Sequence, residues 1–492
     1  VINTAQALAQ QLNATTRGIQ TLRNDAEMGI STAIATANNA LTQIADINNQ
    51  LQRVGRTDAS TAALLDQRDK CVDQLAELMD IRVVTNDANQ ITVFTNSGVQ
   101  LVGAEASRLS FNAQGTVTAN TQWNSDPTLS NLGSITLTFP HGGSLDLIAT
   151  NSLRSGKLAA YVELRDKTLV QAQAQIDQLA AVMASALSDK SVDGVAATSG
   201  AQTGFDVDLA ALKAGNIVHL TYTDTVSGTT HKVSIVRVDD PSVLPLSNTA
   251  TADPGDEVVG IDFSGGMASV VSQLNTAFAS ANIQFSNPAG STLRVLDDGA
   301  AGLSDIDALS ATVTESSLTG GGAELPLFTD GGNLFTGAIT ASGTQQTGLA
   351  GRITVNTALI GDPSRLVVYS TSPLTSSGDT TRPDFLYDRL MNGSYYYSPQ
   401  SGIGTTAAPY RGTLRDFTQQ FISAQGEIAS AADQLKQGQD VVLNTLQQKF
   451  DSSAGINIDE EMAHLLALQN AYAANARIMS VVKEMFNALL QA

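Results

Sequence analysis

The sequence has few of the residues from which active sites and disulfide frameworks are built. Its 492 residues include one cysteine, one tryptophan and four histidines, and only 5% of the chain is aromatic. The lone Cys71 excludes an internal disulfide and a zinc site made of several thiolates. Because it lies within the helix-like segment DKCVDQLAEL, we expect it to be a small buried side chain.

Catalytic motifs are missing as well. No histidine lies in an H-E-x-x-H pattern, and the chain has no G-x-S-x-G elbow and no G-x-x-x-x-G-K-[ST] phosphate loop. Glu460 and His464 are four residues apart, which a helix-surface pair explains more simply than a metal site. The acidic pairs at 239–240 and 297–298 lack the spacing of a calcium loop and are interpreted as turn caps. We therefore predict no catalytic, cofactor-binding or metal-binding residue.

Positive charge and long apolar runs are also scarce. The chain carries 27 basic and 47 acidic residues, a net charge of -20, which argues against binding to nucleic acid. Residues 191–330 hold 17 acidic and 4 basic residues, so this segment carries most of the negative charge and is expected to face solvent. No run of apolar residues is long enough to predict a membrane span, and no secretory signal is visible at the N-terminal end.

Helical periodicity is what the sequence has in abundance. Apolar residues recur at seven-residue steps from Ala5 to Val54, which predicts one helix roughly 75 Å long. A second apolar row completes the buried face. We assign to it Leu8, Thr15 and Leu22, followed after a shift of one residue by Ile30, Ala37, Ile44 and Leu51. After a break at 55–60, a second helix is predicted over Thr61–Met79.

The rest of the chain alternates between β and helical patterns. Period-two alternation predicts a small β-domain at 82–150, and hairpins with one helix are predicted within 191–330. Helical patterns occupy 153–187 and 413–450, whereas 331–412 is rich in loops and the GGG run at 320–322 is interpreted as a linker. We therefore predict an α+β multidomain fold: an elongated, coiled-coil-like helical stem built from both chain ends, with antiparallel β-rich insert domains nested between them.

Four segments follow from these patterns. Residues 1–190 form the N-terminal part of the stem together with the β-domain, and 191–330 form an acidic outer insert domain. Residues 331–455 are a loop-rich segment that returns to the helical stem, and 456–492 form a terminal helix.

The terminal helix carries an apolar stripe whose members recur three or four residues apart, with one heptad gap at Gln469. A stripe of this length must be buried against the protein's own core or against other subunits. We predict that it is an assembly interface. Its residues are Ile458, Met462, Leu465, Leu468, Tyr472, Ala476, Met479, Val482, Phe486 and Leu489.

The segment NIDEEMAHLLALQNAYAANARIMSVVKEMFNALL resembles the C-terminal helix of bacterial flagellar axial proteins, and most of all that of the hook-filament junction family. ALLDQRDKCVDQLAELMDI at 63–81, followed by QITVFTNSGVQLV at 90–102, is similar to the signature after the long helix in that family. Together with 151–188 and 413–446, the resemblance covers about half of the chain. Family members begin with an Asn- and Ala-rich segment that pairs with the terminal helix. None precedes Val1, so the sequence is interpreted as a fragment.

The resemblance implies a structural subunit of the flagellum, not an enzyme, that joins hook to filament through helix-helix and domain-domain contacts. It implies several partners: hook subunits, a second junction protein or flagellin, other copies of the chain in a ring, and an export chaperone that holds the terminal helix. It also implies an extracellular protein exported through the type III channel without a cleaved signal peptide, with no cofactor and no nucleic acid or membrane partner.

Two alternatives stay open. One is a different axial protein, such as a flagellin or a hook-like subunit, and the signature at 63–81 favours the junction family over it. The other is a secreted enzyme or a glycan-binding adhesin. An adhesin would need an aromatic or metal site in the insert.

Overall fold

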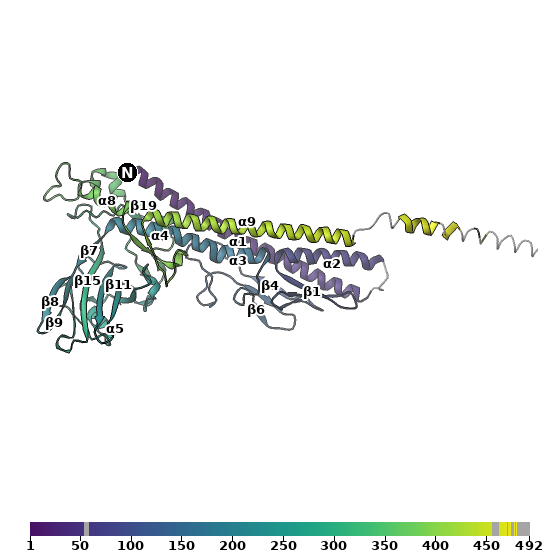
Figure 1. Ribbon diagram of the computed structural model, residues 1–492, viewed down its shortest axis with the longest axis horizontal. Coiled ribbons are helices and arrows are strands. Elements are labelled where there is room, and N and C mark those ends of the chain that lie inside the picture. The colour runs from purple at the N-terminus through teal and green to yellow at the C-terminus, as the bar shows by residue number, and fades with distance from the viewer. Residues whose placement is uncertain (54–58, 455–461, 470, 474–476, 478, 480–492) are drawn as a thin grey trace, which may run out of the picture. The chain divides into compact units, whose positions relative to one another are not determined.

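A computed structural model describes the chain apart from residues 54–58, 455–461, 470, 474–476, 478 and 480–492 (Figure 1). The chain divides into two compact units, residues 1–421 and residues 422–492. The predicted break at 55–60 falls largely outside the described residues.

Long helices run side by side along the first unit (Figure 1). They are α1 (Ile2–Leu51), α2 (Ala59–Leu78), α3 (Gly156–Glu163) and α4 (Leu169–Ser188), and a short π-helix, η1 (Leu164–Thr168), joins α3 to α4. The predicted helices at 5–54, 61–79 and 153–187 are therefore confirmed within one to three residues at their ends. Cys71 is buried in α2, as expected.

The second apolar row assigned to α1 is wrong in its first half. Leu8 and Leu22 are 42% and 50% exposed. The buried row is instead Ala9, Thr16 and Arg23, which continues to Ile30 in strict seven-residue steps without any shift. Two polar residues in this row concealed it from an analysis of hydrophobicity alone.

Two small antiparallel sheets follow α2, where period-two alternation predicted them. The first contains β1 (Ile81–Thr85), β2 (Ile91–Thr95) and β3 (Gln100–Val102), and the second contains β4 (Arg108–Phe111), β5 (Ile135–Thr138) and β6 (Ser144–Asp146). Their inner faces pack with α1, α2 and α3 in what we term the first core. Its fully buried members include Ile30, Leu41, Ile44, Leu75, Met79, Val93, Leu137 and Leu158.

The insert contains two sheets and one long helix. Strands β7 (Asp189–Asp193), β10 (Ile217–Asp224), β11 (Thr229–Val238), β12 (Glu257–Asp262) and β15 (Ser304–Thr314) form a sheet in the order β12-β11-β10-β15-β7. The second sheet, in the order β13-β14-β9-β8, contains β8 (Val195–Ser199), β9 (Gln202–Asp208), β13 (Gln284–Ser286) and β14 (Thr292–Leu296). Helix α5 (Gly266–Ala277) packs with both sheets in a core of their own, so both predicted hairpins and the helix are confirmed. The sheets are not purely antiparallel as predicted, because β12 runs parallel to β11.

Short 3-10 turns lie in the loops of the insert: η2 (Pro241–Val243), η3 (Asn248–Ala250) and η4 (Gly299–Ala301). The side chain of Asp240 accepts the backbone N–H of Ser242 at 3.1 Å, and that of Asp297 accepts the N–H of Gly299 at 2.8 Å. Asp240 and Asp297 are thus turn caps, as predicted, whereas Asp239 pairs with Arg237 at 2.9 Å.

The insert enters and leaves the helical part at one place. Strand β7 continues directly from α4 and pairs with the last strand, β15. The N–H of Glu315 then donates to the carbonyl of Ser188 at 2.8 Å, and the N–H of Leu325 donates to that of Leu187 at 2.7 Å. Phe328, which the sequence placed in the insert, packs with the helical part.

The chain then returns through short elements to a last long helix. They are β16 (Phe328–Asp330), β17 (Ile339–Thr340), β18 (Gly343–Thr344), α6 (Leu349–Arg352), β19 (Ile353–Val355), α7 (Thr357–Gly361), η5 (Pro363–Leu366), α8 (Thr381–Met391), β20 (Tyr395–Tyr397), η6 (Pro399–Ser401), β21 (Tyr410–Gly412) and α9 (Leu414–Ala454). This segment packs with the first half of α1 and with α4 in the second core. Members of the second core include Leu12, Ile19, Leu187, Leu325, Leu349, Leu359, Tyr397 and Phe417.

Candidate assembly interface

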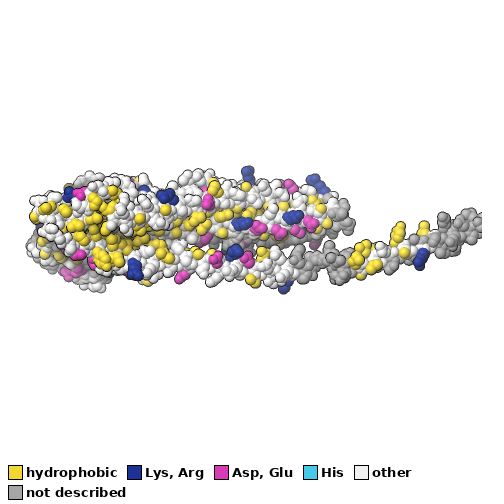
Figure 2. Space-filling view, turned by 90° about the horizontal axis from the view of Figure 1, so that it is seen from above, with side chains coloured by type: hydrophobic (Ala, Val, Ile, Leu, Met, Phe, Trp, Pro, Cys, Tyr) yellow, Lys and Arg dark blue, Asp and Glu magenta, His cyan; other side chains and the backbone are white. Residues whose placement is uncertain are grey.

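The described part of the predicted terminal interface is helical and exposed. Residues 462–469 and 471–473 are helical. The described interface residues are Met462, Leu465, Leu468, Tyr472 and Met479, with exposed fractions of 54%, 56%, 59%, 80% and 70%. The remaining predicted members, Ile458, Ala476, Val482, Phe486 and Leu489, lie outside the described residues. Hydrophobic side chains follow the described stretch in Figure 2.

Helix α9 carries a second exposed apolar row in the unit formed by residues 422–492. Ile428, Leu435 and Val442 follow one another at seven-residue steps and are 39%, 66% and 52% exposed. The sequence predicted that the heptads of 413–450 would be buried in a stem. That burial is found only in the first two turns of α9, so the structure does not confirm the coiled-coil stem.

Aromatic side chains bury those first two turns. The ring of Phe417 stacks on that of Tyr397 with centroids 3.8 Å apart and an interplanar angle of 9°, and Phe421 meets Phe417 edge-on at 5.8 Å. Tyr397 is fully buried, and burial raises the pKa of its hydroxyl. Tyr397 thereby anchors the start of α9 to the second core.

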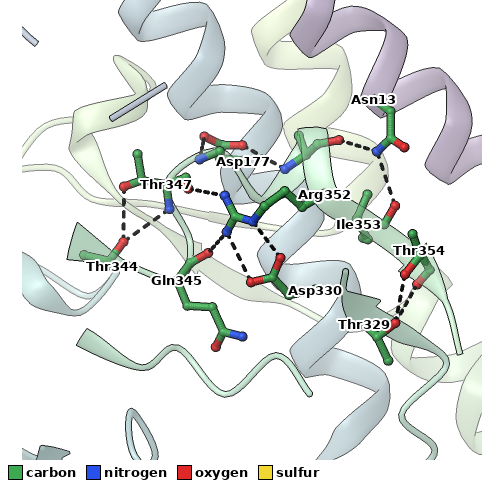
Figure 3. A network of polar contacts seen from close by, with 12 residues as sticks. Asn13, Asp177, Thr329, Asp330, Thr344, Gln345, Thr347, Arg352, Ile353 and Thr354 are labelled. Atoms are coloured by element: carbon green, nitrogen blue, oxygen red, sulfur yellow. Dashed lines mark hydrogen bonds and ion pairs between the residues drawn. The ribbon is translucent and has the colours of Figure 1, made fainter. Parts of the chain in front are cut away.

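A polar network ties two long helices to the returning segment (Figure 3). The carboxylate of Asp177 in α4 accepts the N–H groups of Gly348 and Ala350 at 2.7 and 2.9 Å. Asn13 in α1 donates its amide to the carbonyls of Ala350 and Ile353 at 2.8 and 3.2 Å. Burial raises the pKa of Asp177 to about 6. Both helices thus hold the backbone of α6 and β19, so this segment cannot shift against either helix without losing hydrogen bonds.

Arg352 closes the same network from the other side (Figure 3). Its guanidinium pairs with Asp330 at 2.7 Å and donates to the carbonyls of Gln345 and Thr347 at 2.8 and 2.9 Å. One side chain therefore joins β16, α6 and the turn between them.

Arg382 holds together a second group of loops, and the sequence did not predict this role. Its side chain is fully buried, and burial lowers its pKa to about 10. The guanidinium has six backbone carbonyls as hydrogen-bond acceptors, those of Leu318, Gly322, Ala323, Glu324, Arg365 and Val368. One signal in the sequence was available. Arg382 lies three and four residues before Phe385 and Leu386, so it shares the face of α8 that these partly buried side chains turn towards the core.

The GGG run at 320–322 is part of this group of loops and not a flexible linker. Gly322 supplies one of the carbonyls that accept from Arg382, and the N–H of Gly321 donates to the carbonyl of Tyr369 at 3.0 Å. The interpretation as a linker was wrong because the partner of these carbonyls lies sixty residues downstream in the chain.

Among the described residues, no group of three or more His, Cys, Asp or Glu side chains is placed to hold a metal ion. Ser234 lies 3.5 Å from His219 but donates its hydroxyl to Asp256 at 2.6 Å, and it is 1% exposed. A serine nucleophile needs the histidine between it and the carboxylate, so this trio is a packing network. Nor does any helix in the described part of the chain combine the length and apolar character needed to cross a membrane.

The first unit has an exposed apolar surface of its own. Five large exposed hydrophobic side chains come from α7, α8 and the chain between them: Ile360, Val367, Leu374, Tyr387 and Met391. Figure 2 shows hydrophobic side chains gathered over the end of the first unit at which α1 begins. Such concentrations on a protein surface mark contact sites.

Two family models match the two ends of the chain. Residues 1–207 match the helical domain of the flagellar hook-associated protein FlgK, and residues 447–492 match the C-terminal region of the flagellar basal body rod FlgEFG proteins. The second match covers the whole predicted terminal interface.

Similar proteins are known from several bacteria. The flagellar hook-associated protein 1 of Escherichia coli is 22% identical over all of this chain, which covers 75% of that protein. The protein of the same name from Salmonella typhimurium is also 22% identical over all of this chain, which covers 76% of it. The solved flagellar hook junction protein FlgK of Burkholderia pseudomallei matches 64% of this chain and 51% of its own, with 18% identity and a TM-score of 0.32.

These matches favour a flagellar protein over an adhesin, and a hook-associated protein over a flagellin or a hook subunit. The relatives are structural proteins of the flagellum and not enzymes. Over its whole length the chain is thus similar to flagellar hook-associated protein 1, a structural component of the bacterial flagellum, and its first 207 residues match the helical domain of that family.

Proposed function

We propose that this chain joins the hook to the filament by placing its terminal stripe in the axial core of the flagellum. The observation that supports this proposal is the exposure of the apolar row on α9 and of the described stripe residues Met462, Leu465, Leu468, Tyr472 and Met479. Burying one leucine side chain stabilises a contact by about 1.5 to 3 kcal/mol, so rows of such residues are a strong source of lattice energy. A subunit that kept them in solvent would gain nothing from them.

The helices of the first unit act as the stem of the subunit in this proposal. Its partners are hook subunits on one side and a second junction protein or flagellin on the other, with further copies of the chain beside it in a ring. Contacts between unlike surfaces of identical subunits close into rings or continue as helices, and both fit a flagellar layer. Sliding between neighbouring stems would let the layer join a bending hook to a stiff filament.

Export places a second demand on the same stripe. We propose that a cytoplasmic chaperone covers residues 456–492 before the chain leaves through the type III channel without a cleaved signal peptide. An amphipathic helix lying in an apolar groove would keep the stripe from aggregating. The mature protein then resides outside the cell, in the flagellum.

Introducing charged side chains into the terminal stripe tests the proposal. Leu465→Asp combined with Leu468→Asp should abolish filament growth in cells that lack their own copy of the protein, because an unpaired charge cannot be buried in an assembled core. Gln469→Asp, at the gap in the stripe, is the matched control and should leave growth intact. Normal filaments in the double variant would refute the assignment of the stripe to the axial core.

We propose further that the acidic insert is an outer module that joining does not require. Its two sheets share a core of their own, and Ser188 and Glu315 are hydrogen-bonded to each other where the insert begins and ends. A short Gly/Ser linker between these two residues should therefore leave the helical part folded. Cells carrying this variant should still grow filaments. Loss of filaments despite a folded and exported protein would show that the insert makes essential lattice contacts.

A further inference from the structure

The helical part of the first unit has two hydrophobic cores with charged residues between them. On α1, the second core ends at Ile19 and the first core begins at Ile30. Across from this gap, the first core ends at Leu158 in α3 and the second begins at Leu169 in α4. The gap is filled by four charged side chains, Arg23, Glu27, Arg165 and Asp166, which we term the polar layer.

The polar layer is buried and electrically balanced. Arg165 pairs with Glu27 at 2.7 Å and with both oxygens of Asp166 at 2.7 Å. Arg23 donates to the carbonyl of Arg165 at 3.0 Å. The side chains of Arg165, Glu27 and Asp166 are 0%, 3% and 6% exposed. The two charges on α1 cancel each other, as do the two on the π-helix, and the ion pair of Arg165 with Glu27 links the two helices.

The same side chains hold the long loop that crosses α1 between β4 and β5. Arg23 donates to the carbonyls of Thr118 and Thr121 at 2.8 and 2.6 Å, and Glu27 accepts the N–H of Gln114 at 2.8 Å. Every polar atom of the layer thus has a fixed partner, and these partners come from three separate segments of the chain.

Alanine is frequent on the buried helix surfaces on both sides of the layer, where it accompanies larger side chains, mostly leucine and isoleucine. The buried alanines of α1 and α4 are Ala5, Ala9, Ala26, Ala33, Ala37, Ala40, Ala45, Ala180, Ala181, Ala184 and Ala186. Small side chains specify an axial position less strictly than large interdigitating side chains do. The alanines bring the helices close together but do not choose one axial position.

We propose that the polar layer fixes the axial register of α1 against α3 and α4. A slide of one helical turn, about 5.4 Å, would separate Arg165 from Glu27. Arg165 would keep Asp166, but Glu27 would be buried without its ion-pair partner and Arg23 would lose the carbonyl of Arg165. The π-helix supports this function, because the extra residue in its turn directs Arg165 and the adjacent Asp166 into one layer. Buried polar groups are known to select one register in helical assemblies.

The other polar tethers of α1 are neutral and mostly reach loops or strands. Asn38 and Asn48 hold the backbone at Leu109 and Ile91, and Gln20 meets Gln173 of α4 at 2.9 Å. Among the described residues, the polar layer is the one place where charges are shared between α1 and the helix beside it. Its removal therefore tests the proposal directly.

The test replaces the layer by apolar side chains of similar volume, Arg23→Met, Glu27→Met, Arg165→Met and Asp166→Leu, in the full chain. Spin labels at Thr42→Cys and Lys167→Cys, in a Cys71→Ala background, report the register. These two sites are displaced along the helix axis, so a slide changes the distance between the labels directly. We expect one narrow distance with the natural layer. The apolar variant should show a second distance that differs by about 5 Å.

Two controls make the outcome decisive. Lys157→Met with Glu77→Met removes an exposed ion pair from the same bundle and should keep the single distance. If the apolar variant does not give a helical circular dichroism spectrum, Glu27→Gln alone is measured, and a new second distance is again expected. A single, unchanged distance in the folded apolar variant, or in Glu27→Gln if that variant must decide, would overturn the proposal.

Discussion

Helices α1 and α9 use the same heptad spacing with opposite results. In α1, the row that includes Ile30, Ala37 and Ile44 is buried, and each of these three residues is 0% exposed. In α9, Leu435 and Val442 continue an equally regular row but are 66% and 52% exposed. Periodicity thus predicts which face of a helix is apolar, but not what covers that face.

What covers the apolar face distinguishes a folding element from an assembly element. The neighbours of α1 are sheets and helices of the same folded unit, some of them, such as α6 and β19, far from it in the chain, so its face is buried within one subunit. The face of α9 beyond Phe421 is exposed in the described chain. In the function proposed here, that face contributes to the stability of an assembly and not to that of one folded chain.

The largest expected effect is on stability, when a charge is introduced into the apolar row of α1 and, for comparison, into that of α9. Ile44→Asp places an unpaired carboxylate in the first core and should destabilise the first unit by more than about 4 kcal/mol, enough to unfold it at moderate temperature. Leu435→Asp should leave the melting temperature of the isolated chain unchanged. Thermal denaturation followed by circular dichroism measures both. Equal losses would show that α9 is buried in the isolated chain, and the comparison would fail.

The next effect concerns the point at which α9 changes from buried to exposed. Phe417→Ala removes the ring stacked on Tyr397 and should cost about 3 to 4 kcal/mol in the free energy of unfolding of the first unit. Val441→Ala truncates a side chain that is 65% exposed and should cost less than about 0.5 kcal/mol. Chemical denaturation of both variants measures the difference. A large cost for Val441→Ala would move the boundary further along α9.

The stability of the first unit should depend on pH through the buried carboxyl group of Asp177. Burial raises the pKa of Asp177 from 3.8 to about 6, so the folded state binds its proton more tightly than the unfolded state does. This contribution to stability is complete below pH 4 and is lost as the pH rises towards 6, and it amounts to something on the order of 3 kcal/mol. Asp177→Asn should reduce the fall in stability between pH 4 and pH 6. An identical pH profile in the variant would contradict this assignment.

The smallest effect compares one glycine in each helix. A Cβ at Gly438 of α9 meets no atom within 4 Å, so Gly438→Ala should stabilise that helix by about 1 kcal/mol. A Cβ at Gly29 of α1 would lie 2.6 Å from the Tyr161 ring, so Gly29→Ala should destabilise the first unit. Hydrogen exchange can follow both helices in the same experiment. Stabilisation by Gly29→Ala would show that the ring moves aside freely.

The sequence predicted helices and strands well because their periodicity is local. The ends of α1 and the hairpin of β10 and β11 followed from spacing alone, and Cys71 was rightly expected to be buried. The domain boundaries stay predictions.

The polar centres were not predictable from spacing, because their partners are far apart in the chain. Thr16 and Arg23 occupy positions in the buried row of α1 that a hydrophobic pattern leaves empty, so exposed leucines were assigned in their place. Arg382 binds carbonyls 14 to 64 residues away, and carbonyls carry no signature in the sequence. In the predicted interface, the described apolar residues are exposed, as an assembly contact requires. The surface that would cover them belongs to another subunit and has no signal in the sequence of one chain.

The paired entry and exit of the insert determine how the subunit bears force. Because Glu315 donates to the carbonyl of Ser188 and β7 pairs with β15, the chain leaves the helical part and returns to it at one spot. Tension along α4 can pass through these hydrogen bonds into the returning segment without stretching the two sheets of the insert. In the function proposed here, the insert therefore lies outside the path along which force is transmitted, so that torque on the flagellum would not strain this domain at its surface.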